Sequence, residues 1–427
     1  MPADDPQPRP TLVVISLVYV PDPASVGQHM HDAAAEMVRR GWRVVVLAAA
    51  RGYEDATVRY PARETRDGVE IRRLPLSSFG KRALPLRLLA GLLFVVQAFA
   101  RGLFVGGVRG VLVSTAPPFA GVFGATLARL KRAALAFWVM DLNPDQLIES
   151  GVISARHPVA RLFDFFNRVT LRRSDGVVAL DRFMADRLER KAAVGERMTI
   201  LPPWPHEDHV QPVAHEDNDF RREHALEGKF VFMYSGNHGM TTPVTTVLDA
   251  ALALRHREDV VFMFIGGGLG KADVRRVIAE HDPGNIVDLP YQPFERLRFS
   301  LSAADVHLVT MVDPVVGCVH PCKVYGAMAV GRPILFVGPE PSHVTDLLSG
   351  EGVGWRVPHG DADACVRQIE AILDTPRGEL AAMGRRARAF IDERYTQARL
   401  LGEFCDAVEA AIARRHPELA GAPGASR

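Results

Sequence analysis

Short apolar runs alternate with helical stretches along almost the whole chain. In the first half, "TLVVISLVYV" (11–20), "RVVVLAAA" (43–50) and "RGVLVSTA" (109–116) are suited to strands buried on both faces. Between the first two lies "GQHMHDAAAEMVRRG", whose apolar residues recur at helical spacing before a terminal glycine. Strand–helix–strand order favours parallel strands with right-handed crossovers, so the sequence predicts a doubly wound α/β sheet.

The same order of elements restarts after a polar interruption. Residues 203–225, "PWPHEDHVQPVAHEDNDFRREHA", carry prolines and charges that are typical of a linker. Beyond them, strand and helix signals alternate again from "KFVFMYSGN" to "PILFVG" and end in two helices. With 427 residues, the chain is also too long for one compact core.

We therefore predict two tandem Rossmann-like domains that face each other across a cleft, where ligands bind at the carboxyl ends of the strands. The predicted parts are an acceptor-binding domain (1–205), a linker (206–225), a donor-binding domain (226–395), and a C-terminal helix that packs back, followed by a loose tail (396–427).

Charge and cysteine content narrow the class of protein. A formal net charge of +1 gives no support for nucleic-acid binding, which requires a basic excess. Four cysteines, all late in the chain, fit a reducing compartment better than a disulfide framework. The amino terminus lacks the pattern of a signal peptide, so we expect a cytoplasmic protein.

One apolar segment near residues 84–108 stands apart. Its longest uncharged run, Leu88 to Ala100, has 13 residues and is too short to cross a bilayer. Basic residues lie at its front edge. A buried core helix and a helix lying in the membrane interface both fit this pattern.

The stretch "VVGCVHPCKVYGAMAVGRPILFVG" (315–338) carries the strongest site signal. Lys323 falls in the first turn of a predicted helix, where it opposes the helix dipole unless an anion is bound. Cys318, His320 and Cys322 suggest a metal site, but the other two cysteines are isolated, so we expect none.

Two glycine-rich turns accompany this helix. "YSGNHG" (234–239) and "FIGGGLGK" (264–271) each follow a predicted strand, and the second brings Lys271 into a helix. Neither matches the dinucleotide fingerprint, which disfavours a nicotinamide dehydrogenase. Three such loops at one sheet edge predict a nucleotide-diphosphate pocket.

These residues carry a resemblance to a known family. The stretches, in chain order, are "DPASVGQHMHDAAAEMVRRGWRVVVL", "VLVSTAPPFAGVFGATLARL", "FWVMDLNPDQLIESG", "ILPPW", "FMYSGNHG", "FIGGG", "PYQPFERLRFSLSAADVHLV" and "HPCKVYGAMAVGRPILFVG". Over residues 12–395 the chain resembles a GT-B glycosyltransferase of the retaining GT4 type. It is most similar to the bacterial branch that includes colanic-acid and O-antigen enzymes.

The resemblance implies a set of site residues. It places Lys323 near the donor diphosphate, Asp141 and Asp145 in the acidic motif of the cleft, and His29 and His31 beside the acceptor glycine Gly27. The implied catalytic residues are Lys323, Asp141, Asp145 and His29, and the acceptor side is Gly27 and His31. The implied donor-binding residues are Gly236, Asn237, His238, Gly266, Gly267, Tyr291, Gly317, Pro321, Cys322 and Tyr325.

Simpler interpretations of some residues stay open at this point. Asp141 and Asp145 also suit a helix cap and a turn, and histidines such as His29 are common on surfaces. Two glutamates that the wider family keeps fall at Cys318 and Gly326, and "MTTP" (240–243) lacks the usual basic residue. A catalytically silent partner protein and a nucleotide-sugar epimerase of the same fold therefore remain as alternatives.

The sequence as a whole predicts a retaining glycosyltransferase. The expected donor is a nucleotide sugar with UDP as the favoured carrier, and the expected acceptor is a lipid-linked or other glycan. We expect no cofactor and no metal, because a lysine and helix termini can stabilise a departing diphosphate. The expected location is the inner face of the plasma membrane, with peripheral contact and no nucleic-acid partner.

Overall fold

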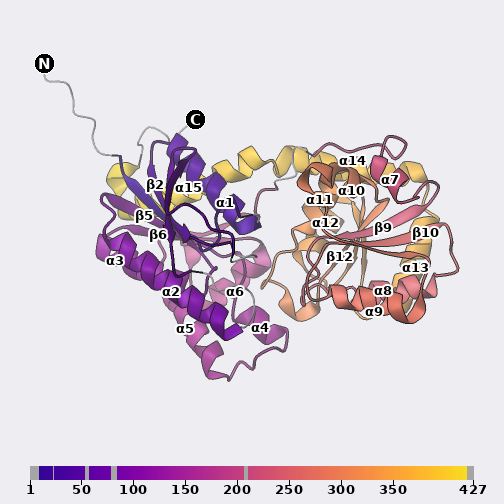
Figure 1. The fold of residues 1–427 in the computed structure, drawn as a ribbon, viewed down its shortest axis with the longest axis horizontal. Helices are drawn as coiled ribbons and strands as arrows, with labels where there is room; N and C mark the ends of the chain where they lie inside the picture. The colour runs from indigo at the N-terminus through magenta and orange to yellow at the C-terminus, as the bar shows by residue number, and fades with distance from the viewer. Residues whose placement is uncertain (1–8, 23, 53–56, 78–83, 206–209, 421–427) are drawn as a thin grey trace, which may run out of the picture. The chain divides into compact units, whose positions relative to one another are not determined.

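The computed structural model describes residues 9–22, 24–52, 57–77, 84–205 and 210–420. The chain divides into two compact units (Figure 1). The first unit comprises Met1–Pro203 and Ala398–Arg427, and the second comprises Trp204–Gln397. Each unit is built around one sheet with helices on both faces.

The first unit contains, in its described residues, an eight-stranded sheet with the order β3-β4-β2-β1-β5-β6-β7-β8. All its pairings are parallel except the antiparallel pair β3–β4. Strands β1 and β6 are fully buried and β5 is buried except at Arg109, as their apolar sequences require. The strands are β1 (Thr11–Ile15), β2 (Arg43–Ala49), β3 (Arg63–Arg66), β4 (Val69–Leu74), β5 (Val108–Ser114), β6 (Ala134–Trp138), β7 (Gly176–Ala179) and β8 (Met198–Ile200).

Helices cover both faces of this sheet. On one face, α2 (Leu84–Leu103) contacts α3 (Ala120–Lys131), and α3 contacts α5 (Pro158–Arg173) (Figure 1). On the other face lie α1 (Ser25–Arg39) and α15 (Gln397–Arg415). Two further helices, α4 (Asp145–Glu149) and α6 (Arg182–Ala192), follow β6 and β7. In the described part of the chain, no helix combines the length and apolar character needed to cross a bilayer.

The C-terminal helix α15 returns to the first unit and is embedded in it. Phe404 is 1% exposed, and its ring centroid lies 4.5 Å from that of Trp138 on β6. Glycines on the strands allow the close approach, because a Cβ at Gly176 would lie 2.6 Å from the Cβ of Ala411. Helix α15, near the end of the chain, thus completes the core of a unit whose sheet is formed by the first 200 residues.

The second unit contains, within the described residues, a six-stranded parallel sheet with the order β11-β10-β9-β12-β13-β14. The order reverses between β9 and β12, which creates a topological switch point. The strands are β9 (Phe230–Ser235), β10 (Val260–Ile265), β11 (Ile286–Leu289), β12 (Val306–Thr310), β13 (Ile334–Val337) and β14 (Gly354–Val357). The helices are α7 (Asp219–Glu223), α8 (Thr245–Ala253), α9 (Lys271–His281), α10 (Leu297–Ser302), α11 (Lys323–Ala329), α12 (His343–Glu351), α13 (Ala362–Leu373) and α14 (Arg377–Arg394).

The predicted fold class, two Rossmann-like domains with parallel sheets, is confirmed. The segment expected to be a linker differs: residues 206–209 lie outside the described residues, and residues 210–225 belong to the second unit. Phe220 and Arg221 in α7 are buried there, and the Arg221 guanidinium donates to the carbonyl oxygens of Ala303, Leu226 and Lys229. The charged composition of residues 203–225 predicted exposed side chains. Arg221 can nevertheless be buried, because its guanidinium donates hydrogen bonds to backbone carbonyl oxygens.

Replacing Phe404 by Ala should destabilise the first unit by about 3–5 kcal/mol, because it leaves a cavity beside Trp138. Thermal and urea unfolding followed by tryptophan fluorescence would measure the loss. Asp406→Ala on the same helix is the matched control. Its ion pair with Arg40 is largely exposed on the Asp406 side, so the free energy of unfolding should change by less than about 1 kcal/mol. Equal effects of the two changes would contradict the packing argument.

Candidate active site

A pocket of about 260 Å³ opens at the switch point of the second unit. It lies at the carboxyl ends of β9, β10 and β11, the edge where ligands bind in sheets of this type, and extends along β12 to His307 and Leu308. No acidic residue is among the described residues that line it. These are Ser235, Gly236, Ile265, Tyr291, Gln292, Leu297, Leu301, His307, Leu308, Cys322, Lys323 and Gly326.

The floor of this edge is formed by two interlocked loops. Gly266 has φ +127°, and a Cβ there would lie 2.0 Å from the carbonyl oxygen of Gly236. The backbone N–H of His238 donates to the Gly267 oxygen over 2.7 Å, and the Gly270 N–H donates to the His238 oxygen over 2.9 Å. Only glycine permits this backbone contact, which explains the glycines in both sequence motifs.

Lys323 begins α11 and lies across the first loop. A Cβ at Gly236 would lie 2.9 Å from the Lys323 Cε atom, and the Nζ atom is 5.1 Å from the centroid of the Tyr234 ring. The side chain is half-buried and, among the described residues, forms no ion pair with a carboxylate. A cation held between a glycine loop and an aromatic face, in a pocket with no acidic lining, is suited to an anionic ligand.

Lys271, the lysine that follows the second glycine-rich turn, has a structural role and does not line the pocket. It is 2% exposed, its Nζ atom lies 2.5 Å from Asp288 Oδ1, and it donates to the Leu289 oxygen over 2.8 Å. The expectation that two lysines face a diphosphate is therefore wrong for Lys271. Its ammonium is held below the loop by a carboxylate and backbone acceptors, because a buried charge requires such partners.

The predicted donor-binding residues divide into two groups. Gly236, Tyr291, Cys322 and Lys323 line the pocket. The others support the lining without being part of it: Asn237, His238, Gly266, Gly267, Gly317, Pro321 and Tyr325.

Two members of the supporting group show how it acts. His238 is fully buried, with its ring centroid 4.5 Å from that of Tyr234. Gly317 has φ +74°, which turns the chain ahead of α11.

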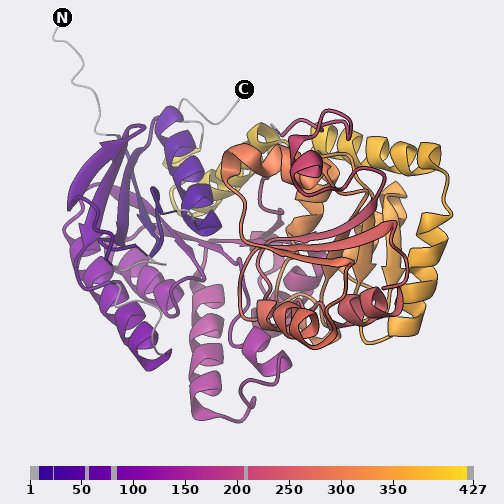
Figure 2. The ribbon, with the colours of Figure 1, turned by 45° about the vertical axis from the view of Figure 1, so that its right-hand side comes forward.

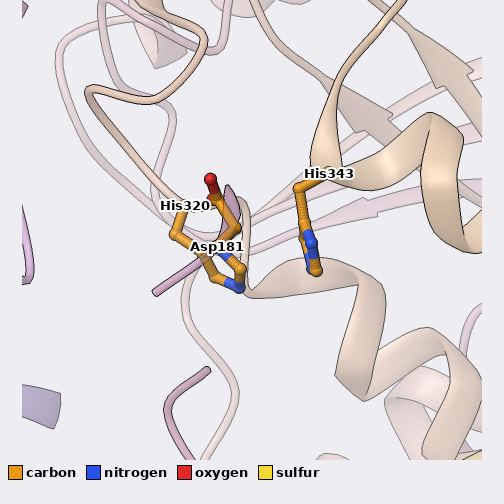
Figure 3. A group of neighbouring side chains, drawn as sticks. All are labelled: Asp181, His320 and His343. Carbon is orange, nitrogen blue, oxygen red and sulfur yellow. The ribbon is translucent and has the colours of Figure 1, made fainter. Parts of the chain in front are cut away.

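A small histidine cluster lies behind α11. The Tyr325 hydroxyl is 2.7 Å from His320 Nε2 and 2.9 Å from His343 Nε2, and the two imidazole centroids are 4.2 Å apart. Figure 3 shows both histidines, His320 from the loop before α11 and His343 from the first residue of α12. A hydroxyl has one proton to donate, so one histidine accepts from Tyr325 and the other donates to it. The third labelled residue, Asp181, belongs to the first unit and caps α6 through the Met184 N–H.

Cys318 and Gly326 stand where the wider family keeps two glutamates, and the surroundings of these two residues differ. Cys318 is fully buried in the apolar cluster beneath α11, so no ligand group is available there. Gly326 lines the pocket, and a Cβ there would meet only Leu301 Cδ1, at 3.7 Å. The second site therefore has room for a side chain that this chain does not supply.

The predicted acceptor residues lie in the first unit. Gly27 belongs to the first turn of α1 rather than to a loop, and a Cβ there would lie 3.0 Å from the Tyr19 Cα. His29 is buried beside Ser25, with 2.8 Å between its Nδ1 and the Ser25 oxygen. His31 joins Tyr19 and Asp67 through its two ring nitrogens, at 3.0 and 2.9 Å. All three residues contribute to the packing of the β1–α1 connection.

Asp141 and Asp145 have different surroundings. Asp141 follows β6 with an exposed side chain, and its backbone N–H donates to Thr115 Oγ1 over 3.2 Å. Asp145 begins α4 and forms an ion pair with Lys191 over 2.8 Å. An engaged carboxylate is a poor candidate for a base, so the geometry favours Asp141 of the two.

Comparisons with known proteins agree with this architecture. Residues 25–204 match the family model described as "Glycosyl transferase 4-like domain". The probable glycosyltransferase WbjE of Pseudomonas aeruginosa is 29% identical over 65% of this chain and 70% of its own length. The putative colanic acid biosynthesis glycosyl transferase WcaI of Escherichia coli (strain K12) is 26% identical over 60% of this chain and 64% of its own.

Solved structures show the same fold. Sucrose-phosphate synthase from Thermosynechococcus elongatus superposes with a TM-score of 0.72 at 16% identity, over 93% of this chain and 97% of its own. HepE from Anabaena, solved in complex with UDP and glucose, gives a TM-score of 0.69 at 12% identity, over 93% of this chain and 99% of its own.

Two Rossmann-like units, one with a pocket at its switch point, are the architecture of the GT-B fold that these solved structures share. Within that class, the family model and the curated relatives support a glycosyltransferase of the GT4 type, similar to WbjE and WcaI. The resemblance found in the sequence is thereby confirmed.

The sequence argument missed His307, which lines the pocket from β12 and is 4% exposed. His307 stands alone in an apolar strand, and a lone histidine in such a strand gives no signal of its own. Its Nε2 atom lies 2.9 Å from the Leu301 oxygen. Burial lowers the pKa of His307 to about 4, so the imidazole is neutral at pH 7.

This pKa shift predicts a loss of stability in acid. Between pH 6.5 and about 4 the unfolded chain binds a proton at His307 and the folded chain does not, so stability falls as the pH is lowered through this range. The effect should reach on the order of 2–3 kcal/mol for one histidine. Urea unfolding at several pH values would show a flatter profile for His307→Gln. The exposed His281→Gln is the control, and a profile unchanged by His307→Gln would refute the assignment.

Proposed function

We propose that this glycosyltransferase moves a sugar from a nucleotide-sugar donor to a lipid-linked or other glycan acceptor in the biosynthesis of a bacterial surface polysaccharide or glycolipid. The observation that carries the proposal is Lys323, a half-buried ammonium without a carboxylate partner among the described residues, in a pocket whose described lining has no acidic residue. An ammonium in this setting can stabilise the charge that develops on a departing diphosphate.

The second unit would hold the donor. Because HepE was solved with UDP and with UDP-glucose, UDP is the favoured carrier, and a hexose or N-acetylhexosamine is the favoured sugar. The Tyr291 ring lies beside Gly267, where it can meet the base, and the amides of the Gly236 loop can approach the phosphates. The seven-residue α11 contributes little dipole, so Lys323 would carry most of the phosphate binding.

The first unit would hold the acceptor. Asp141 is the favoured base or positioning group, since its carboxylate is exposed after β6 and Asp145 is engaged by Lys191. Close by, the residues after β5 and β6 line a small cavity of about 40 Å³ that contains Phe119, Phe163 and Asn143. We propose retention of anomeric configuration, in keeping with the GT4 type, and transfer at the inner face of the plasma membrane in peripheral contact with it.

A donor screen tests the proposal. The purified protein would be incubated with UDP-, GDP-, dTDP- and CMP-linked sugars and a membrane lipid extract, with products identified by mass spectrometry. Transfer of a sugar to lipid or glycan supports the proposal. Conversion of the donor to an isomer without acceptor identifies an epimerase instead, and no turnover with any donor favours a silent partner protein.

Lys323→Ala should weaken UDP binding about tenfold to hundredfold, or about 1.4–2.8 kcal/mol, because it removes a charge-assisted hydrogen bond. Isothermal titration calorimetry with UDP would measure the change. Lys323→Arg should retain part of the affinity, and Arg367→Ala, an exposed site on α13, should retain all of it. Unchanged UDP affinity in Lys323→Ala would remove the basis of the donor site.

Transfer should not require a divalent metal. Among the described residues that line the pocket there is no carboxylate to share a metal with the diphosphate, and Lys323 can supply the positive charge. Activity in excess EDTA should equal that in its absence. A loss in EDTA that Mg²⁺ or Mn²⁺ restores would contradict this expectation.

A further inference from the structure

The outer surface of α2 exposes apolar side chains in a continuous stripe. Leu89, Leu92 and Val96 are 48, 40 and 46% exposed, and Leu103 continues the same helical face. The opposite side of the helix is also apolar, with Phe94, Val95 and Ala98 buried against the unit. A helix that is apolar all round is normally covered on every side, so this stripe indicates a missing partner.

The surface extends past the end of α2. Phe104 is 86% exposed and Leu130, at the end of α3, is 60% exposed. The two helix ends adjoin, because Lys131 donates to the Val105 oxygen over 2.9 Å. On α5, Leu162 and Phe165 are exposed as well. Figure 1 labels α2, α3 and α5 together on one side of the sheet of the first unit, as their contacts require.

These three helices carry many more basic than acidic residues. Their sequences contain two basic residues in α2, two in α3 and four in α5, against one acidic residue, Asp164. That carboxylate is already paired with Arg168 over 2.7 Å and with Lys191. The chain as a whole has a net charge of only +1, so the excess belongs to this surface.

An arginine-lined hollow of about 410 Å³ lies where α3 and α5 end. Arg129, Arg172 and Arg173 contribute to it and, within the described residues, form no ion pair. Asp175, the acidic residue in the hollow, is paired with Arg415 over 3.2 Å. Guanidinium groups without partners beside exposed Leu and Phe side chains suit phosphate headgroups beside acyl chains.

We propose that the outer face of α2, α3 and α5 docks on an anionic phospholipid bilayer. Apolar side chains of α2 and Phe104 enter the interface, while the arginines at the helix ends bind lipid phosphates. A second copy of the chain is a poorer partner, because a two-fold contact through this face would oppose the same positive charges. The inference rests on the proposed peripheral membrane contact and gives it a surface and a lipid class.

Vesicle flotation tests the docking without donor or acceptor, so its result is independent of transfer activity. The full-length protein should float with vesicles of phosphatidylcholine mixed with phosphatidylglycerol and bind phosphatidylcholine alone more weakly. Leu92→Glu/Val96→Glu should weaken binding to both vesicle types at least about tenfold. Arg101→Glu/Arg129→Glu should weaken binding about tenfold on the anionic vesicles only.

Matched controls alter equally exposed residues elsewhere. Ile200→Glu, on the edge strand β8, and Arg367→Glu/Arg385→Glu, in the second unit, should leave vesicle binding unchanged. Wild-type protein that fails to float with anionic vesicles would overturn the proposal, as would controls that lose as much binding as the test variants. A wild-type dimer that Leu92→Glu/Val96→Glu converts to a monomer, seen by light scattering, would assign the face to a second copy instead.

Discussion

The main chains of two loops are in direct contact where Gly236 and Gly266 follow β9 and β10, and the pocket of the second unit depends on this contact. A side chain at Gly266 would collide with the Gly236 oxygen, and one at Gly236 would displace the stem of Lys323. The two loops therefore fit together only with glycine at both positions, and the space above them is what Lys323 occupies. Because the contact is between main-chain atoms, it holds this edge of the pocket in place and leaves the side chains that line the pocket free of that task.

The two lysines of the second unit show how position decides the role of a charge. Both begin helices that follow glycine-containing loops. The ammonium of Lys271 is buried and forms an ion pair with Asp288. The ammonium of Lys323 lies against the ring of Tyr234. The ion pair of Lys271 stabilises the loop floor, and the unpaired ammonium of Lys323 is available to a ligand. A similar contrast holds for Asp145, which is engaged by Lys191, and Asp141, which is exposed.

The two faces of the sheet in the first unit are covered in different ways. Its sheet is completed on one face by α15 from the end of the chain, where Phe404 and Trp138 pack closely. On the other face, α2 is apolar toward the sheet and toward the outside, which a core helix does not require. The sequence left a core helix and an interfacial helix as equal interpretations. The structure shows that α2 buries one side and exposes the other, so the core interpretation holds for the inner face, and the membrane interface stays a proposal for the outer face.

The sequence alone determined the architecture. Apolar strands of buried type, alternating with helices and repeated after residue 225, specify two parallel sheets, because periodicity and order are local properties of a chain. The helix predicted to begin near Lys271 is α9, and the one predicted to carry Lys323 in its first turn is α11. The glycine motifs also located the pocket edge, since strand ends and glycines can be read directly.

Tertiary structure alone decided which side chains face the ligand. The sequence does not show that Lys271 is paired with a carboxylate inside the fold, that His307 is a pocket residue, or that Phe220 and Arg221 are buried rather than part of a linker. Each of these outcomes depends on partners distant in the sequence, such as Asp288 for Lys271 and Ala303 for Arg221. A residue's burial and pairing are set by what packs against it, and that information exists only once the chain has folded.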